Sequence, residues 1–219
     1  MSELSVKNAS LQNIPGLLRA EQMPMDVFAG YLEKRRATIN APVELFSEIC
    51  PVHAYINCPP DKVFEYMANP HSLEEWTYSV RGLKASPIAN TLVGDELLAS
   101  GTKIFCRTES NAAAKLVDYY CAWDQGEELW MIYLNRIVPA EPLLKKPGSI
   151  VFWQNCRHPN YKNNPYGSLV PEGRKEWVGD FWDLFHAGHL VEIENLKAIL
   201  EYRHSRGLPM GPFVGPGAA

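Results

Sequence analysis

Residues 180–203 read DFWDLFHAGHLVEIENLKAILEYR, the longest segment of this chain with the spacing of an amphipathic helix. Its apolar positions recur at intervals of three and four residues, which places them on one face of a helix. His186 and His189 fall within this series, so the spacing predicts that both imidazoles point inward with the apolar side chains. The residues of this face are Trp182, His186, His189, Ile193, Leu196 and Leu200, with Phe185 and Leu190 beside it.

Two titratable side chains on the inward face of one helix either anchor a polar network or face a cavity. Imidazole changes its charge near neutral pH, which suits it to moving protons in a reaction. We therefore interpret His186 and His189 as candidate catalytic residues, and Phe185 beside them as a candidate substrate contact.

Ahead of this helix the apolar residues alternate with polar ones, which is typical of β-strands. Short turns such as Ser100-Gly101 and Pro147-Gly148 separate the segments and predict antiparallel hairpins. We expect a sheet of six to seven strands at residues 52–57, 78–85, 92–98, 103–109, 115–123, 128–138 and 149–157.

The segment between the first two strands predicts two short helices. Cys58-Pro59-Pro60-Asp61 ends the first strand and begins a helix whose apolar side holds Val63 and Met67. Asn69-Pro70 breaks that helix, and residues 72–76 form the second one. The element order predicts an α+β fold in which a curved antiparallel sheet wraps around the long C-terminal helix and leaves a pocket at one end.

The motif INCPPDKVFEYM at residues 56–67, followed by LEEW at residues 73–76, resembles the opening of the START/Bet v 1-like (SRPBCC) superfamily. This superfamily includes polyketide cyclases, aromatases and lipid-transfer domains. The resemblance covers residues 50–205 by element order and implies a helix-grip fold. It also implies a cavity between helix and sheet that binds a small hydrophobic or aromatic molecule. In the cyclase-like members, polar groups in that cavity move protons without an organic cofactor.

The resemblance leaves both ends of the chain outside the common fold. We expect an N-terminal arm at residues 1–45 with one amphipathic helix at 25–39, a ligand-binding domain at 46–206, and a flexible Pro/Gly tail at 207–219. The arm is expected to dock on the main domain or on a second copy of the chain, so a homodimer through the arm is one expectation. The polar loop at 158–175 is a candidate lid over the cavity mouth.

Composition and charge narrow the range of partners. The chain has 219 residues, 46% hydrophobic and 21% charged, with a net charge of −4 and a pI near 5.9, so nothing points to nucleic acid. No apolar run is long enough to span a membrane, and no leader peptide is recognisable at the N-terminus. The five cysteines form no CxxC pair, so we expect a cytoplasmic protein with reduced thiols.

Strand side chains complete the candidate site. Each strand offers two alternating sets, and we favour the sets that turn Tyr133, Asn135 and Gln154 toward the cavity. Tyr133 is then a further candidate catalytic residue, and Asn135 orients a substrate carbonyl beside it. The other candidate substrate contacts are polar groups near strand ends or in the loop, and aromatic residues able to line a cavity: Arg107, His158, Tyr120 and Trp153.

Three functions fit this pattern. We favour a cofactor-independent biosynthetic enzyme of cyclase, dehydratase or aromatase type, acting on an apolar or aromatic substrate with the helix histidines moving protons. The second function is a carrier of a hydrophobic metabolite without catalysis. The third is a metal-dependent enzyme in which His186 and His189 bind the ion with Asp183, Glu192 or His158. The favoured hypothesis includes no metal site.

Overall fold

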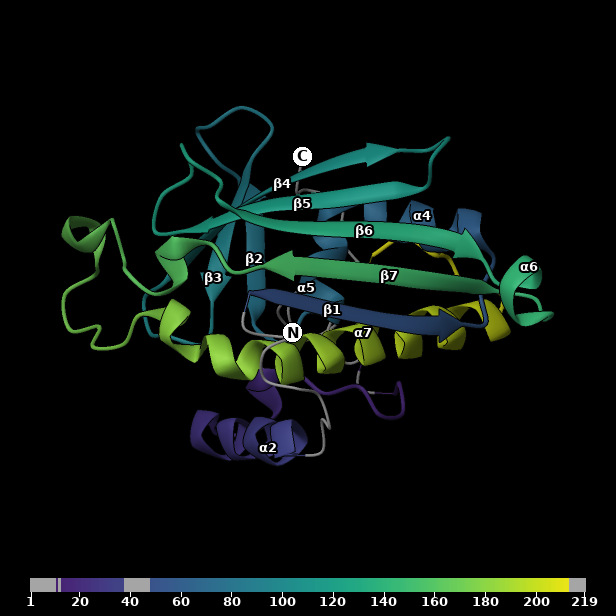
Figure 1. Cartoon of the computed structure of the whole chain (residues 1–219), viewed down its shortest axis with the longest axis horizontal. Helices are drawn as coiled ribbons and strands as arrows, with labels where there is room; N and C mark the ends of the chain where they lie inside the picture. Colours follow the sequence, from purple (N-terminus) through teal and green to yellow (C-terminus); the bar gives the residue numbers. More distant parts are fainter. Residues whose placement is uncertain (1–10, 12, 38–47, 213–219) are drawn as a thin grey trace, which may run out of the picture.

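The computed structural model describes residue 11 and residues 13–37 and 48–212. Within these residues lies a seven-stranded sheet in the order β1-β7-β6-β5-β4-β3-β2, with α7 (Trp182–Ser205) beside β1 and α2 (Met25–Ala37) outside α7 (Figure 1). The strands are β1 (Ile49–Ile56), β2 (Val80–Ala85), β3 (Leu92–Glu96), β4 (Lys103–Asn111), β5 (Leu116–Trp123), β6 (Met131–Pro139) and β7 (Ser149–Cys156).

The α+β, helix-grip architecture that the sequence predicts is confirmed. Every pair of neighbouring strands is antiparallel. The short helices α4 (Pro60–Ala68) and α5 (Leu73–Trp76) follow the first strand, as expected from the proline-containing motif. The elements that the sequence pattern did not predict are short: α6 (Glu141–Leu144), η1 (Ala20–Gln22), η2 (Pro70–Ser72), η3 (Pro159–Tyr161), η4 (Gly167–Leu169) and η5 (Val178–Phe181).

Burial alternates along the strands and identifies the concave face of the sheet. In β6, Met131, Asn135 and Ile137 are buried, whereas Ile132 and Leu134 are exposed. The buried set packs against α4, α5 and α7, because a sheet with one apolar face needs helices to cover it. The core therefore lies between the concave face and these three helices.

Glu75 of α5 ties the two short helices to α7. Its carboxylate accepts a hydrogen bond from Tyr66 Oη at 2.8 Å and pairs with Arg203 Nη2 at 2.9 Å. Trp76 follows it into the core and contacts Trp153 edge to face, with 5.5 Å between ring centroids. The motif that resembles the superfamily opening thus builds the junction of three helices.

The described part of the N-terminal arm packs on the main domain. Asn195 of α7 accepts from the backbone N of Leu18 at 2.9 Å and donates to its carbonyl at 2.7 Å. The ring of Phe28 on α2 lies 5.3 Å from the ring of Tyr78. Three apolar residues ahead of α2 join the main core: Leu11, Ile14 and Leu17.

The last described residues, up to 212, also contact the core. Met210 is buried, and the carbonyl of Gly211 accepts a hydrogen bond from Arg203 Nη1 at 3.2 Å. The rest of the predicted tail, 213–219, lies outside the described residues, as do 1–10, 12 and the junction between arm and domain at 38–47.

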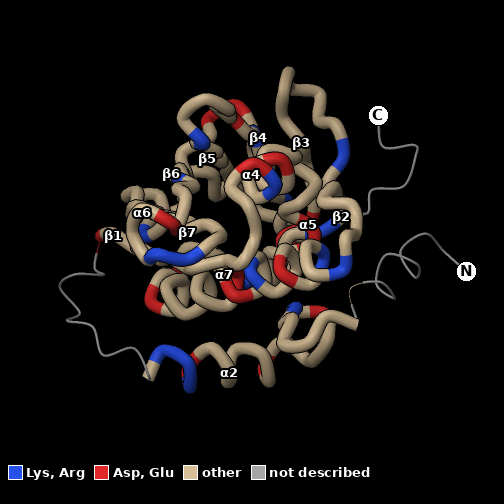
Figure 2. Tube along the Cα trace, turned by 90° about the vertical axis from the view of Figure 1, so that its right-hand side faces the viewer, with Lys and Arg blue, Asp and Glu red and all other residues tan. Residues whose placement is uncertain are grey.

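Charged residues are spread over the molecule. Lys and Arg segments alternate with Asp and Glu segments along the trace, and they do not gather on one side (Figure 2). None of the helices in the described ranges is long and apolar enough to cross a membrane.

Candidate functional site

The two histidines of α7 lie in different surroundings. His189 is 5% exposed and faces the concave side of the sheet, whereas His186 is half-buried with Nε2 3.3 Å from the carbonyl oxygen of Pro51 on β1. Burial lowers the pKa of His186, although its contact with Pro51 acts in the opposite direction. His186 does not line the cavity described below, contrary to expectation, because Phe185 takes the inward position one residue earlier.

His189 lies at the centre of a buried hydrogen-bond network. Its Nδ1 is 3.0 Å from Glu192 Oε2, and its Nε2 is 3.4 Å from Asn155 Nδ2. Asn155 also donates to Tyr161 Oη at 3.1 Å, and Glu192 Oε1 accepts from the backbone N of Tyr78 at 3.4 Å. In the tautomer whose Nδ1–H donates to the carboxylate, the lone pair of Nε2 accepts the hydrogen bond from Asn155 Nδ2.

Three aromatic side chains surround the imidazole of His189. The ring centroids of Trp153, Tyr133 and Phe185 lie 4.6, 5.7 and 5.7 Å from it. Burial raises the pKa of Tyr133 well above its usual value, with the nearby Tyr161 adding to the rise, so its hydroxyl keeps its proton. Apolar walls of this kind exclude water and strengthen the electrostatic interactions inside them.

Glu96, the last residue of β3, supplies a second acidic group that the sequence pattern did not single out. It is 6% exposed, and the backbone N of Leu98 donates to its Oε1 at 3.2 Å. Burial raises the pKa of this carboxyl to about 7, the charge of Glu192 adds to the rise, and a hydrogen bond with Ser79 opposes it. A carboxyl with such a pKa gives up and takes back a proton near neutral pH.

These groups line one cavity of about 60 Å³ between α7 and the concave face of the sheet. Such a volume holds a few water molecules and is well below the roughly 300–1,000 Å³ of ordinary ligand pockets. A substrate larger than a few atoms therefore needs movement of lining side chains or additional space beside the cavity. The polar lining includes Thr77, Ser79, Glu96, Tyr133, His189 and Glu192.

Asn135 and Gln154 do not line this cavity. Asn135 is buried on the concave face, where its amide donates to the carbonyls of Val117 at 2.8 Å and Tyr133 at 3.3 Å and so supports the strands. Gln154 was expected to face inward, but it lies on the outer face with its amide 3.8 Å from Cys156 Sγ. The two residues that flank Gln154 on β7, Trp153 and Asn155, are buried.

Arg107 and Tyr120 also lie on the outer face, contrary to the expectation that they contact a ligand in the cavity. Arg107 Cζ is 5.0 Å from the ring of Tyr120, and its Nε is 3.0 Å from Glu109 Oε1. The residues next to them, Cys106 and Cys121, face inward and line the cavity with their Sγ atoms 3.5 Å apart. A shift of one position on each strand separates the two faces.

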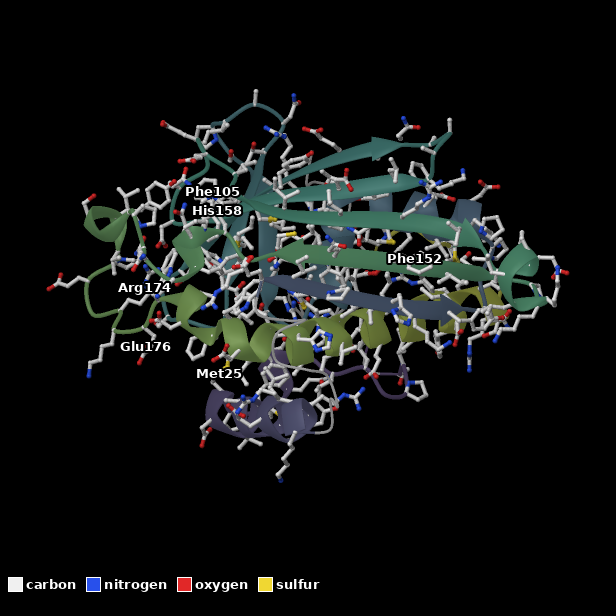
Figure 3. All side chains as sticks on the ribbon, in the orientation of Figure 1. Met25, Phe105, Phe152, His158, Arg174 and Glu176 are labelled. Carbon is white, nitrogen blue, oxygen red and sulfur yellow. The ribbon has the colours of Figure 1, made fainter. Side chains whose placement is uncertain are left out.

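The long polar loop is fastened to the end of the sheet, and His158 serves that attachment (Figure 3). His158 Nδ1 accepts from Asn160 N at 3.2 Å, and its ring packs 5.4 Å from Trp130. The guanidinium of Arg174 donates to both carboxylate oxygens of Asp124, at 2.8 and 2.7 Å. His158 does not line the cavity, so its expected role as a substrate contact has no geometric support.

The two histidines proposed as metal ligands lie apart in the structure. His186 turns toward Pro51 and His189 toward Asn155, so the two imidazoles do not converge on one point. Across the described ranges, no group of three His, Cys, Asp or Glu side chains lies close enough to hold an ion.

Four residues of the His189 network and its cavity were not predicted as catalytic or substrate-binding residues: Glu96, Asn155, Tyr161 and Glu192. Glu192 was considered only as a metal ligand, although its position three residues after His189 places the two side chains together on a helix. The sequence indicates the burial of Glu96 more weakly: alternation along the strand places it on the same face as the apolar Leu98. Asn155 belonged to the strand set that we did not favour, and nothing in the loop composition indicated Tyr161.

Comparisons with known proteins show no matching family model and no matching curated protein. Solved structures with a similar chain path include the Zhui aromatase/cyclase from Streptomyces sp. R1128, at 10% identity over 74% of this chain and 98% of that one, with a TM-score of 0.47. A START superfamily protein from Mycobacterium smegmatis has 12% identity over 73% and 98%, with a TM-score of 0.45.

The Aha1 dimer from Colwellia psychrerythraea is similar at 13% identity over 70% of this chain and 96% of that one, with a TM-score of 0.44. Proteins with different names thus have a similar chain fold at low sequence identity, and the similarity does not indicate a function for this chain. The helix-grip fold of the chain rests on its own element order and sheet topology.

Proposed function

We propose that this protein is an acid–base enzyme without an organic cofactor, which cyclises or dehydrates a small apolar or aromatic carbonyl compound. The observation that carries the proposal is the buried pair of His189 and Glu192, which shares one cavity with Glu96. Each buried ionisable group costs desolvation free energy, so a simple carrier would be more stable with apolar side chains in these places. Three such groups in one cavity favour chemistry over storage.

In the proposed reaction His189 is the base and Glu96 the acid. Nε2 of His189 gives up its hydrogen bond with Asn155 and takes a proton from the carbon next to the substrate carbonyl, while Glu192 stabilises the imidazolium through Nδ1. Protonated Glu96 gives its proton to the carbonyl oxygen, and the product of these two transfers is an enol.

A dehydration then restores both groups. The enol returns its hydroxyl proton to Glu96, the carbon–oxygen bond of a β-hydroxyl breaks, and the imidazolium of His189 gives its proton to the departing oxygen. Water leaves, and a double bond remains next to the carbonyl. Tyr133, Trp153 and Phe185 are the proposed substrate contacts, since they line the cavity around the imidazole.

Acetophenone, a small aryl methyl ketone, tests the base. An enzyme that enolises it in D₂O replaces the methyl protons with deuterium, and the loss of the methyl proton NMR signal measures the rate. We expect His189→Gln to lower the enzyme-dependent exchange by about 10²–10⁴-fold, the usual contribution of a general base. His186→Gln is the matched control on the same helix, and its exchange rate should equal that of the wild type.

Equal exchange rates in the wild type and His189→Gln would contradict the proposal. Acetophenone that binds to the wild type without any exchange above the buffer rate would replace the enzyme with the non-catalytic carrier as the function of this cavity.

A further inference from the structure

A second cavity lies beneath the N-terminal arm, between α2 and the first turns of α7. Its volume is about 150 Å³, and Met25 stands beside it, between the two helices (Figure 3). Asp26, whose side chain is exposed, also borders it. We call this space the arm cavity and the space beside His189 the central cavity. The apolar walls of the arm cavity include Met25, Phe28, Ala29, Leu32, Phe181 and Leu184.

Only a layer of side chains separates the two cavities. Tyr78, Leu98 and Phe185 line both of them. Leu98 is only partly buried, so a change of its rotamer, which needs no movement of the backbone, is the step that would join the two spaces into one elongated site. Tyr78 has less freedom, because it packs closely over Gly188, where a Cβ would lie 2.8 Å from its ring.

The two cavities differ in chemistry and complement each other in size. An apolar cavity of about 150 Å³ in another protein stays dry and binds benzene, so the arm cavity has the size of one aromatic ring. The central cavity is smaller and carries the polar groups Glu96, His189 and Glu192. Together they match a molecule with an apolar group at one end and a small polar group at the other.

We propose that the arm cavity binds the apolar group of the substrate, an aromatic ring or an alkyl group of the same size, while the carbonyl enters the central cavity. The placement of the carbonyl rests on the proposed function, whereas binding of the ring does not. The N-terminal arm is then part of the ligand site. Its helix is held in place by the contact of Phe28 with Tyr78 and by the ion pair of Arg35 with Glu194 of α7.

Fluorobenzene is the probe for the arm cavity, and its binding is measured by fluorine NMR titration of the full chain. Ala29→Met fills the cavity from within α2, so we expect it to weaken fluorobenzene binding by about tenfold or more. Val27→Met adds the same side chain to an exposed position of the same helix, and binding should equal that of the wild type. Thermal unfolding of both variants checks that they fold.

A change in the opposite direction keeps the test decisive if Ala29→Met folds poorly. Leu184→Ala enlarges the cavity, so the variant should bind 1-fluoronaphthalene more tightly than the wild type does. Nuclear Overhauser contacts locate the probe, and we expect them between fluorobenzene and the methyl groups of Met25 and Leu184. Binding that Ala29→Met leaves unchanged, or contacts confined to Ile104 of the central cavity, would overturn the inference.

The outcome separates this inference from the proposed function. One outcome is that fluorobenzene binds the wild type but not Ala29→Met, while the wild type exchanges no acetophenone protons. That outcome supports the arm cavity as a binding site and contradicts the proposed enzyme. The opposite outcome is proton exchange that depends on His189, no binding of fluorobenzene, and an unchanged KM for acetophenone in Ala29→Met. That outcome supports the enzyme and contradicts binding in the arm cavity.

Discussion

Protonation of Glu96 affects both the stability of the fold and the proposed chemistry. Its carboxyl is buried near Glu192, so the structure favours the neutral form and raises the pKa to about 7. With this pKa the neutral and ionised forms coexist near pH 7, and the neutral form donates a hydrogen bond or a proton to a carbonyl oxygen, which the carboxylate does not do.

Glu96→Gln tests this state through stability. The pKa of the carboxyl is 4.5 in the reference state and about 7 in the folded protein, so the stabilising effect of its proton is complete below pH 4.5 and is lost as the pH rises to 7. We expect the free energy of unfolding of the wild type to fall by up to about 3 kcal/mol over this window relative to Glu96→Gln. Urea denaturation at several pH values measures the difference.

Asp95→Asn is the control for this measurement, because Asp95 is exposed on the same strand and pairs with the exposed Lys103. The free energy of unfolding of Asp95→Asn should depend on pH in the same way as that of the wild type. The same slope in the wild type and in Glu96→Gln would show that the Glu96 carboxyl titrates alike in the folded and unfolded chain, and would remove it as the proposed acid.

Single side chains were the hardest level to predict from the sequence. His186 and His189 both fit an apolar stripe, and only the packing of α7 against β1 shows that His186 faces the sheet edge. Gln154 and Asn155 are neighbours of similar polarity, so the composition of β7 does not reveal which one is buried. Such choices depend on contacts between elements that are distant in the sequence.

The secondary elements were predictable because their signals are local. Turn residues bracketed each strand, and Cys58-Pro59-Pro60-Asp61 marked the start of α4, where Pro60 is the first helical residue. The buried ion pair that locks the helices together was not predictable, since Glu75 and Arg203 are 128 residues apart. α7 thus has two functions: its first half holds His189, and its last turn holds the junction with α4 and α5.

Arg203→Ala should destabilise the protein by about 3–5 kcal/mol, because it leaves the Glu75 carboxylate buried without its cation. Arg206→Ala is the control on the following turn, where the guanidinium is exposed over Tyr202, and it should change stability by less than about 0.5 kcal/mol. Chemical denaturation gives both values. A cost for Arg203→Ala as small as that of the control would mean that the junction does not depend on the ion pair.

For the molecule as a whole, the element order predicted a sheet closed by a helix, and the structure confirms it. The position of the arm was left open between the main domain and a second copy, and the described arm residues pack on α7. A homodimer through the arm stays a prediction. The element order predicted a cavity between the long helix and the sheet, but cavity volumes depend on how every lining side chain packs, so the sequence indicates neither the small volume of the central cavity nor the arm cavity.

In the proposed function His189, and not His186, faces a ligand between α7 and the sheet. Protein labelled with ¹⁵N-histidine displays the six imidazoles of the chain, and the variants His189→Gln and His186→Gln assign two of them. We predict that acetophenone shifts the Nε2 resonance of His189 and leaves that of His186 in place. A shift of His186 alone, or no shift of His189 when acetophenone is bound, would contradict the claim.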